Sequence, residues 1–104
     1  MDVATLKSDI QKAPGMLVYF KNDQCGPCQV LRPQVEDLVK KEFPELAFEI
    51  VDTVENPMLT GEFGVYSNPT ILVYFDGKEY LRKSKYIGIS ELENDIRRIY
   101  EMAF

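Results

Sequence analysis

The sequence has 104 residues, of which 45% are apolar and 28% charged, a composition typical of one compact domain. Twelve Lys and Arg residues against 17 Asp and Glu residues give a net charge of −5, which argues against a nucleic-acid-binding protein because such proteins need a basic face. No apolar run approaches the roughly 20 residues of a membrane-spanning helix, and the N-terminus lacks the features of a secretory signal. We therefore expect residues 1–104 to form a single soluble domain, monomeric and, if Met1 is the native start, cytosolic, without nucleic-acid or membrane partners.

The first half of the chain alternates between helical and strand patterns. Apolar residues at helical spacing predict a helix over residues 3–13, and five consecutive apolar residues at 16–20 predict a strand buried on both faces. A longer helical pattern runs from residue 25 to residue 43 and contains Pro33, where we expect a kink but not an end. A second strand is predicted over residues 46–51.

The second half of the chain begins with a short helix and continues with a hairpin. Asn56 is a predicted N-cap for a helix over residues 57–63, with proline at its first position. Residues 70–75 are nearly all apolar and predict another buried strand. Asp76-Gly77 is a typical two-residue turn, so residues 78–86 should return antiparallel to that strand.

The last element is a predicted helix that opens with a capping box. Ser90 and Glu93 have the spacing of such a box, and apolar residues continue at helical spacing to Ala103. The element order is thus α, β, α, β, α, β, β, α. Strands separated by a long helix pair in parallel and strands joined by a tight turn pair antiparallel, so we expect a mixed α/β sheet with helices on both faces.

Both cysteines lie in the run Cys25-Gly26-Pro27-Cys28, between a buried strand and the start of a helix. The helix N-terminus stabilises an anion, so Cys25 can form a thiolate at lower pH than a free cysteine. Cys28, one turn into the helix, can then break a mixed disulfide formed by Cys25. Pro27 suits the first helical turn, and Gly26 leaves room for another backbone. This pattern predicts a reactive dithiol.

Three other interpretations of the two cysteines were weighed. A structural disulfide over four residues closes too small a loop to add much stability. A zinc site needs four ligands, and a chain with two thiols and no histidine could supply it only in an oligomer. The cysteines could also be two ordinary thiols without a redox role.

Several motifs together resemble the thioredoxin family, over almost the whole chain: Cys25-Gly26-Pro27-Cys28, Pro33, Asn68-Pro69-Thr70, Asp76-Gly77 and Gly88. The resemblance implies a thioredoxin-like three-layer sandwich, in which helices flank a four-stranded mixed sheet. We expect four strands and not five, without the first strand of full-length thioredoxins, since the first predicted element resembles the helix that follows that strand.

The resemblance also implies an activity and a substrate site. The expected function is a cytosolic thiol–disulfide oxidoreductase that reduces protein disulfides through Cys25 and Cys28, in electron transport and cell redox homeostasis. It needs no bound cofactor, since the dithiol carries two electrons, but it needs a recycling reductase or a small thiol. A cis peptide bond is expected before Pro69, with the backbone of Asn68 available to pair with an extended substrate segment.

Some positions depart from the family pattern. Gln24 stands where thioredoxins usually carry tryptophan, and Tyr19 and Phe48 stand where a buried carboxylate and its lysine are expected. With Asn68 before the proline, these changes predict a more polar groove and slower resolution by Cys28. Two alternatives therefore stay open: a reductase of mixed disulfides with a low-molecular-weight thiol, and a weakly catalytic thioredoxin-fold adaptor or redox sensor.

One strand is rich in cations. Lys78, Arg82, Lys83 and Lys85 all fall in the strand predicted over residues 78–86. They could form a docking patch for an acidic partner. The more economical interpretation is an edge strand whose charges block aggregation.

Overall fold

The computed structural model describes the backbone of residues 2–22 and 26–104, and the side chains of residues 2–22 and 30–104. The elements follow the order predicted from the sequence. They are α1 (Val3–Lys12), β1 (Gly15–Lys21), α2 (Gly26–Glu42), β2 (Ala47–Asp52), α3 (Pro57–Phe63), β3 (Thr70–Phe75), β4 (Lys78–Ser84) and α4 (Ile89–Ala103).

The strands of the described residues form one mixed sheet in the order β2-β1-β3-β4. β1 is parallel to β2 and antiparallel to β3, and β3 is antiparallel to β4. This arrangement confirms the expected four-stranded mixed sheet. It also makes β1 and β3 the inner strands, which explains why residues 16–20 and 71–75 are all apolar or aromatic.

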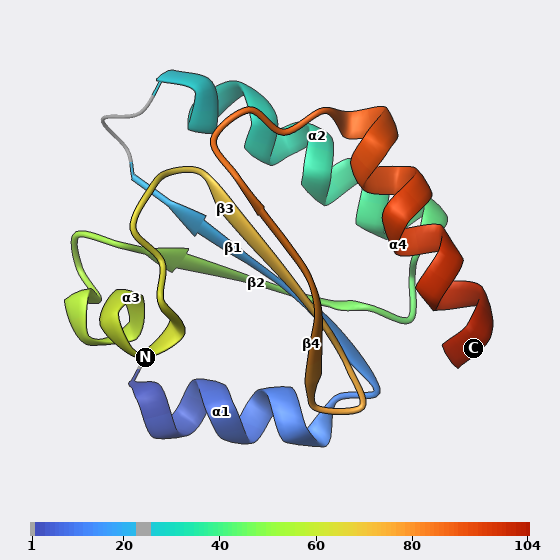
Figure 1. The fold of residues 1–104 in the computed structure, drawn as a ribbon, viewed down its shortest axis with the longest axis horizontal. Helices are drawn as coiled ribbons and strands as arrows, with labels where there is room; N and C mark the ends of the chain where they lie inside the picture. Colours follow the sequence, from blue (N-terminus) through green and yellow to red (C-terminus); the bar gives the residue numbers. More distant parts are fainter. Residues whose placement is uncertain (1, 23–25) are drawn as a thin grey trace.

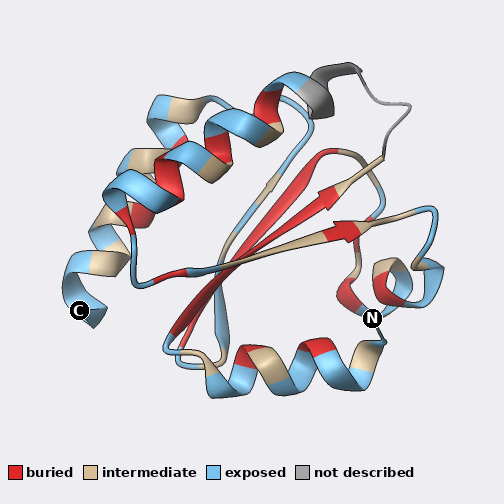
Figure 2. Cartoon of the chain, turned by 180° about the vertical axis from the view of Figure 1, so that it is seen from behind, coloured by how far each residue is buried: buried red, intermediate tan, exposed pale blue. Residues whose placement is uncertain are grey.

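Helices cover both faces of the sheet, so the chain folds as three layers (Figure 1). One core cluster joins β1 and β3 to α1 and α3, through residues such as Leu6 and Phe63. The other joins the opposite face to α2 and α4, through residues such as Val35 and Leu92. Figure 2 shows buried residues along the inner strands and on the sheet-facing sides of the helices. None of the described helices combines the length and apolarity needed to cross a bilayer.

Helix α2 connects the two parallel strands and continues through Pro33, as predicted. Its buried face carries Leu31, Val35 and Val39, which pack against the sheet. The opposite face carries ion pairs one turn apart, such as Lys41 with Asp37. The amphipathic pattern therefore fixes which side of this helix faces the sheet.

The predicted capping box at the start of α4 is wrong. The helix begins at Ile89 with Gly88 as its N-cap, and Ser90 lies inside the helix. The first helical hydrogen bond runs from the Leu92 N–H to the Gly88 carbonyl, at 3.0 Å. Glu93 pairs instead with Arg97 one turn later. The extended backbone of Gly88 starts the helix two residues earlier than a Ser90 cap would.

The predicted bounds of α3 are confirmed, but its cap differs in detail from the prediction, and the end of β4 differs in position. Asn56 is the N-cap of α3, but its side chain makes no capping hydrogen bond and donates instead to the Asp52 carbonyl at 3.0 Å. β4 ends at Ser84 and not at residue 86. Lys85 has a positive φ of 64°, which leaves the extended conformation and ends the strand.

The cations of β4 do not form one docking patch. Arg82 binds Glu79 and donates to the Phe63 carbonyl on the α3 side of the sheet. Lys83 points toward α4 and pairs with Asp95 at 2.8 Å. Because these two cations have internal partners on opposite faces, the edge-strand interpretation explains this part of the sequence better.

Candidate active site

The carboxyl end of β1 and the start of β3 lie at the same edge of the sheet. β1 and β2 are parallel, so Lys21 pairs with Asp52 where both strands end. β3 runs antiparallel to β1, so its first residue, Thr70, pairs with Phe20. The segment that leads from β1 into α2 and the segment that precedes Thr70 therefore start from neighbouring points (Figure 1).

The described part of the cysteine motif belongs to the helix that follows β1. Cys25, with Asp23 and Gln24, lies outside the described residues, whereas the backbone of Gly26, Pro27 and Cys28 forms the first turn of α2. The prediction that a helix starts near Cys25 is thus confirmed. The first N–H groups of an α-helix have no partner within the helix, and they favour a nearby negative charge. Nothing in the described residues tests the geometry of the two thiols.

The expected cis peptide bond between Asn68 and Pro69 is confirmed. Hydrogen bonds fix the backbone around it. The Lys85 N–H donates to the Pro69 carbonyl at 2.9 Å, and the Thr70 hydroxyl donates to the Ser67 carbonyl at 2.7 Å. The loop before β3 is therefore held against the loop that follows β4.

Two cavities flank Pro69. The larger has a volume of about 450 Å³, and the smaller one of about 350 Å³ lies on the Ser67 and Asn68 side. Pro69, Lys85 and Tyr86 line both. The rest of the larger cavity is lined by Val30, Leu31, Gln34, Ile87 and Gly88. Helix α2 and the loop before α4 supply apolar side chains to these walls, which the sequence alone did not bring together. Gln24, on which the expectation of a more polar groove partly rests, lies outside the described residues, so that expectation stays a prediction.

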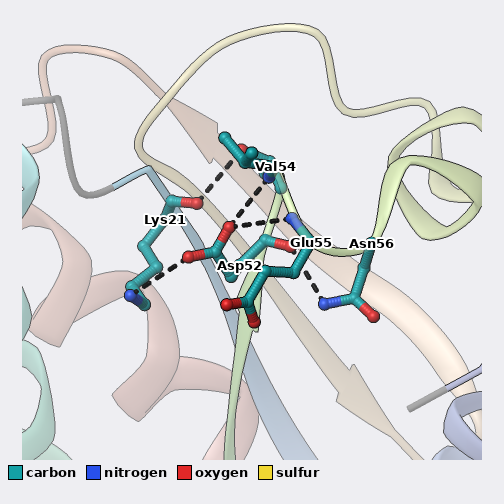
Figure 3. A network of polar contacts seen from close by, with 6 residues as sticks. Lys21, Asp52, Val54, Glu55 and Asn56 are labelled. Carbon is teal, nitrogen blue, oxygen red and sulfur yellow. Dashed lines mark hydrogen bonds and ion pairs between the residues drawn. The ribbon is translucent and has the colours of Figure 1, made fainter.

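A polar network ties the end of β1 to the turn that follows β2 (Figure 3). Lys21 Nζ lies 3.3 Å from Asp52 Oδ2. The Lys21 carbonyl accepts hydrogen bonds from the N–H and the hydroxyl of Thr53, at 2.9 and 3.1 Å. Asp52 Oδ1 in turn accepts from the N–H groups of Val54 and Glu55, at 2.8 and 3.1 Å. The last residue of β1, just before the cysteine segment, is thus anchored through both its side chain and its backbone.

This environment keeps Asp52 ionised. The hydrogen bond from the Glu55 N–H, with those from the Val54 N–H and the Lys21 ammonium, lowers the pKa of the Asp52 carboxyl against the opposing effect of desolvation. Sequence reasoning did not single out Lys21 or Asp52. The available signal was a cation and an anion at the ends of two strands predicted to be parallel.

Tyr19 occupies the position where the resemblance leads one to expect a buried carboxylate. Its side chain is fully buried between the sheet and the helices α2 and α4. The parallel register pairs Tyr19 with Ile50, while Phe48 pairs with Leu17. The residue beside Tyr19 in β2 is therefore Ile50 and not Phe48, although all of these side chains are apolar or aromatic.

Metal-binding side chains do not gather in the described part of the chain. No group of three Asp, Glu, Cys or His residues there is placed to hold an ion. The whole sequence contains no histidine. A zinc site would have to use the thiols of Cys25 and Cys28 together with those of another chain.

Comparisons with known proteins agree with this architecture. The family profile described as thioredoxin matches residues 1–99. The chain is 23% identical over 100 residues to the thioredoxin-like protein YdfQ of Bacillus subtilis, covering 96% of this chain and 88% of that protein. It is 33% identical over 84 residues to thioredoxin of Chlamydia muridarum, covering 81% of this chain and 78% of the relative.

Solved structures lead to the same conclusion. A mutant thioredoxin from Halobacterium salinarum superposes with a TM-score of 0.81 at 28% identity, covering 91% of this chain and 82% of that one. Thioredoxin 1 from Thermosipho africanus superposes with a TM-score of 0.78 at 30% identity, covering 85% of this chain and 97% of that one. The profile match spans nearly the whole sequence, and it shows that the chain belongs to the thioredoxin family and has a thiol–disulfide oxidoreductase role.

Proposed function

We propose that the chain reduces protein disulfides, with Cys25 as the attacking thiolate and Cys28 as the resolving thiol. One observation supports this most directly: α2 begins inside the cysteine motif, at the sheet edge where the cis Asn68–Pro69 bond also lies. A helix N-terminus at this position favours a thiolate over a thiol. The neighbouring cis proline segment offers a backbone to which an extended substrate can align.

The proposed reaction proceeds in two exchanges. The Cys25 thiolate attacks one sulfur of the substrate disulfide, forms a mixed disulfide and releases the other substrate sulfur as a thiolate. Cys28, after losing its proton, attacks the sulfur of Cys25 and releases the second substrate thiolate. The products are a Cys25–Cys28 disulfide and a substrate dithiol that takes up two protons. Two electrons pass from the protein to the substrate.

Residues around the thiols have positioning roles in this proposal. Gly26 and Pro27 shape the first turn of α2, and Gly26 leaves space for the substrate backbone. The backbone of Asn68 aligns the substrate strand, and Pro69 holds that backbone at the edge of the groove. A recycling reductase or a small thiol then reduces the Cys25–Cys28 disulfide. We place this cycle in the cytosol, in a monomer that serves redox homeostasis.

Two other functions remain as candidates. Reduction of mixed disulfides with a low-molecular-weight thiol would need Cys25 but not Cys28. A weakly catalytic adaptor or redox sensor is favoured by the identity of residue 19, because a tyrosine and not a carboxylate stands where the family pattern has the residue that accepts the proton of Cys28, and its register partner in β2 is Ile50.

A reduction assay driven by dithiothreitol separates these candidates. We expect the wild type to reduce a protein disulfide with many turnovers, and we expect both Cys25→Ser and Cys28→Ser to lose that activity. If Cys28→Ser stays active on glutathionylated peptides, the monothiol function is favoured. If the wild type shows negligible turnover but holds a partner tightly, the adaptor function replaces the proposal.

A trapping experiment identifies the substrate. Cys28→Ser cannot resolve the mixed disulfide, so proteins attacked by Cys25 stay covalently attached. Treatment with a reductant should release them for identification by mass spectrometry. The same preparation from a Cys25→Ser, Cys28→Ser double variant provides the control, and equal recovery from both would contradict attack by Cys25.

A further inference from the structure

The loop between β4 and α4 forms one wall of the groove at Pro69. Lys85 adopts a left-handed backbone conformation, with φ 64°, and its N–H donates to the Pro69 carbonyl at 2.9 Å. Non-glycine residues rarely adopt this conformation, and they do so where surrounding contacts hold them in it. Lys85 and Tyr86 are thus held beside the proline and do not extend the edge strand.

The groove offers an exposed apolar surface. Tyr86 is fully exposed, and Val30 on the facing helix is 66% exposed. Leu31 and Ile87 lie deeper in the cavity of about 450 Å³ that these residues line. Concave apolar surfaces with few polar groups are typical of binding sites for apolar side chains. A partner segment lying between Tyr86 and Val30 would bury the exposed apolar surface of both side chains, which favours binding.

Lys85 is the one charged residue among the described residues that line the two cavities beside Pro69. The ion pairs of the described residues do not include it. Lys83, two residues earlier, differs in this respect, since it pairs with Glu91 and Asp95 at 3.1 and 2.8 Å. The Lys85 ammonium is therefore available to a partner, in a chain whose net charge is −5.

We propose that Lys85 makes this groove selective for extended protein segments that carry a carboxylate near an aromatic or aliphatic residue. The inference rests on the proposed function and names the substrate class of that site. The apolar residue would pack against Tyr86 and Val30, while the Asp or Glu side chain pairs with Lys85. Charge complementarity of this kind discriminates between partners more than it raises affinity, because an exposed ion pair is worth little.

Peptide binding without disulfide exchange tests this selectivity. Three peptides would share one sequence, in which Ser replaces the substrate cysteine and Tyr stands next to that Ser. They would differ at one position only, next to the Tyr, which is Asp, Asn or Lys. Binding to the wild type would be followed by NMR chemical-shift titration at low ionic strength. We expect the Asp peptide to bind about threefold more tightly than the Asn peptide and the Lys peptide to bind most weakly.

Two variants locate the effect. Lys85→Gln should remove the difference among the three peptides. Lys78→Gln is the matched control, because Lys78 is also an exposed lysine of the β4 region without an ion pair among the described residues, but it lies at the other end of the strand. This control should keep the full difference. Tyr86→Ser should weaken all three peptides by a similar factor.

Several outcomes would overturn the inference. They are equal binding of the three peptides to the wild type, equal effects of Lys85→Gln and Lys78→Gln, and no measurable binding of any peptide. Since the peptides contain no cysteine, the result is independent of thiol chemistry. A protein that reduces disulfides but does not discriminate among the peptides refutes the selectivity alone. A protein that discriminates but does not reduce disulfides refutes the proposed function alone.

Discussion

Lys21 and Asp52 end two neighbouring parallel strands, and their side chains meet with Lys21 Nζ 3.3 Å from Asp52 Oδ2. The same carboxylate accepts backbone hydrogen bonds from Val54 and Glu55. The Lys21 carbonyl also accepts two hydrogen bonds from Thr53. One pair of residues thus joins the strand that leads to the cysteines with the turn that leads to α3.

Replacing Asp52 by Asn should destabilise the protein in a pH-dependent way. The folded-state pKa of Asp52 is lowered from 3.8, so its carboxylate adds stability above that pH, and this stability is lost as the pH falls through the lower folded-state pKa. We expect Asp52→Asn to lower the urea midpoint at about pH 7. The gap to the wild type should narrow toward about pH 3, as the wild-type carboxyl becomes protonated.

Asp37→Asn is the control for this experiment. Asp37 pairs with Lys41 on the exposed face of α2, where its side chain is 61% exposed. Exposed ion pairs of this kind contribute little to stability. A shift of the urea midpoint as large for Asp37→Asn as for Asp52→Asn would show that the network at the strand ends has no special role.

Replacing Tyr19 by Phe should leave the resolving step unchanged. A phenol has a reference pKa near 10 and is a poor base at neutral pH, so we expect water to accept the proton of Cys28. The test is a single-turnover measurement of the decay of the mixed disulfide at about pH 7. A slower decay in Tyr19→Phe, with the initial attack unchanged, would assign the Tyr19 hydroxyl a part in the proton transfer.

Two glycine substitutions should act in opposite directions. A Cβ on Gly15 would lie 2.6 Å from Leu46 Cδ2 and 3.3 Å from the Phe75 ring, both of which are buried. Gly15→Ala should therefore lower the free energy of unfolding by about 1–3 kcal/mol. Gly61 lies in α3 with no atom within 4 Å of such a Cβ, so Gly61→Ala should raise that free energy by up to about 1 kcal/mol. Urea denaturation measures both, and equal effects would contradict the packing argument.

Replacing Tyr74 by Phe should make the protein more resistant to base. Burial, with a contribution from Glu79, raises the pKa of Tyr74 from 10.0 to about 12. The unfolded chain therefore loses this proton first as the pH rises above 10, so the stability contributed by the protonated phenol declines between pH 10 and about 12. We expect the urea midpoint of Tyr74→Phe to fall less than that of the wild type between about pH 9 and about pH 11.

Tyr66→Phe provides the control for the basic range. Tyr66 is 88% exposed, in the loop between α3 and β3. The urea midpoint of Tyr66→Phe should equal that of the wild type both at about pH 9 and at about pH 11. Equal behaviour of Tyr74→Phe and Tyr66→Phe would show that burial of the Tyr74 phenol does not govern the response to base.

The sequence was sufficient to predict the helices and strands because their patterns depend on local spacing. The middle residues of the inner strands are all apolar, and the predicted helices other than the short one after Asn56 have apolar residues at helical spacing, so these elements could be assigned without knowing their neighbours. The last strand was assigned from the Asp76-Gly77 turn that precedes it. The start of α4 was assigned wrongly because Ser90 satisfies a local capping pattern while the Gly88 carbonyl makes the first helical bond. Two competing local signals cannot be ranked without the packing of the loop.

Only those features of the site that belong to a sequence motif could be predicted. The cis bond before Pro69 followed from the family resemblance, whereas the Lys21–Asp52 pair depends on the register of two strands whose residues are 31 positions apart. The groove wall at Lys85 and Tyr86 could not be predicted either. The left-handed backbone conformation is usually adopted by glycine or asparagine, and here Lys85 adopts it. No sequence pattern therefore indicated that β4 would end at Ser84.

The position of β1 at the centre of the sheet has a consequence for synthesis. This strand leaves the ribosome before either of its partners, and its second neighbour, β3, ends only at Phe75. Until then β1 is an apolar strand whose backbone N–H and C=O groups have no partner strand along one edge. We expect translation paused before Thr70 to yield a ligand for chaperones and proteases, and completion of β3 to end that exposure.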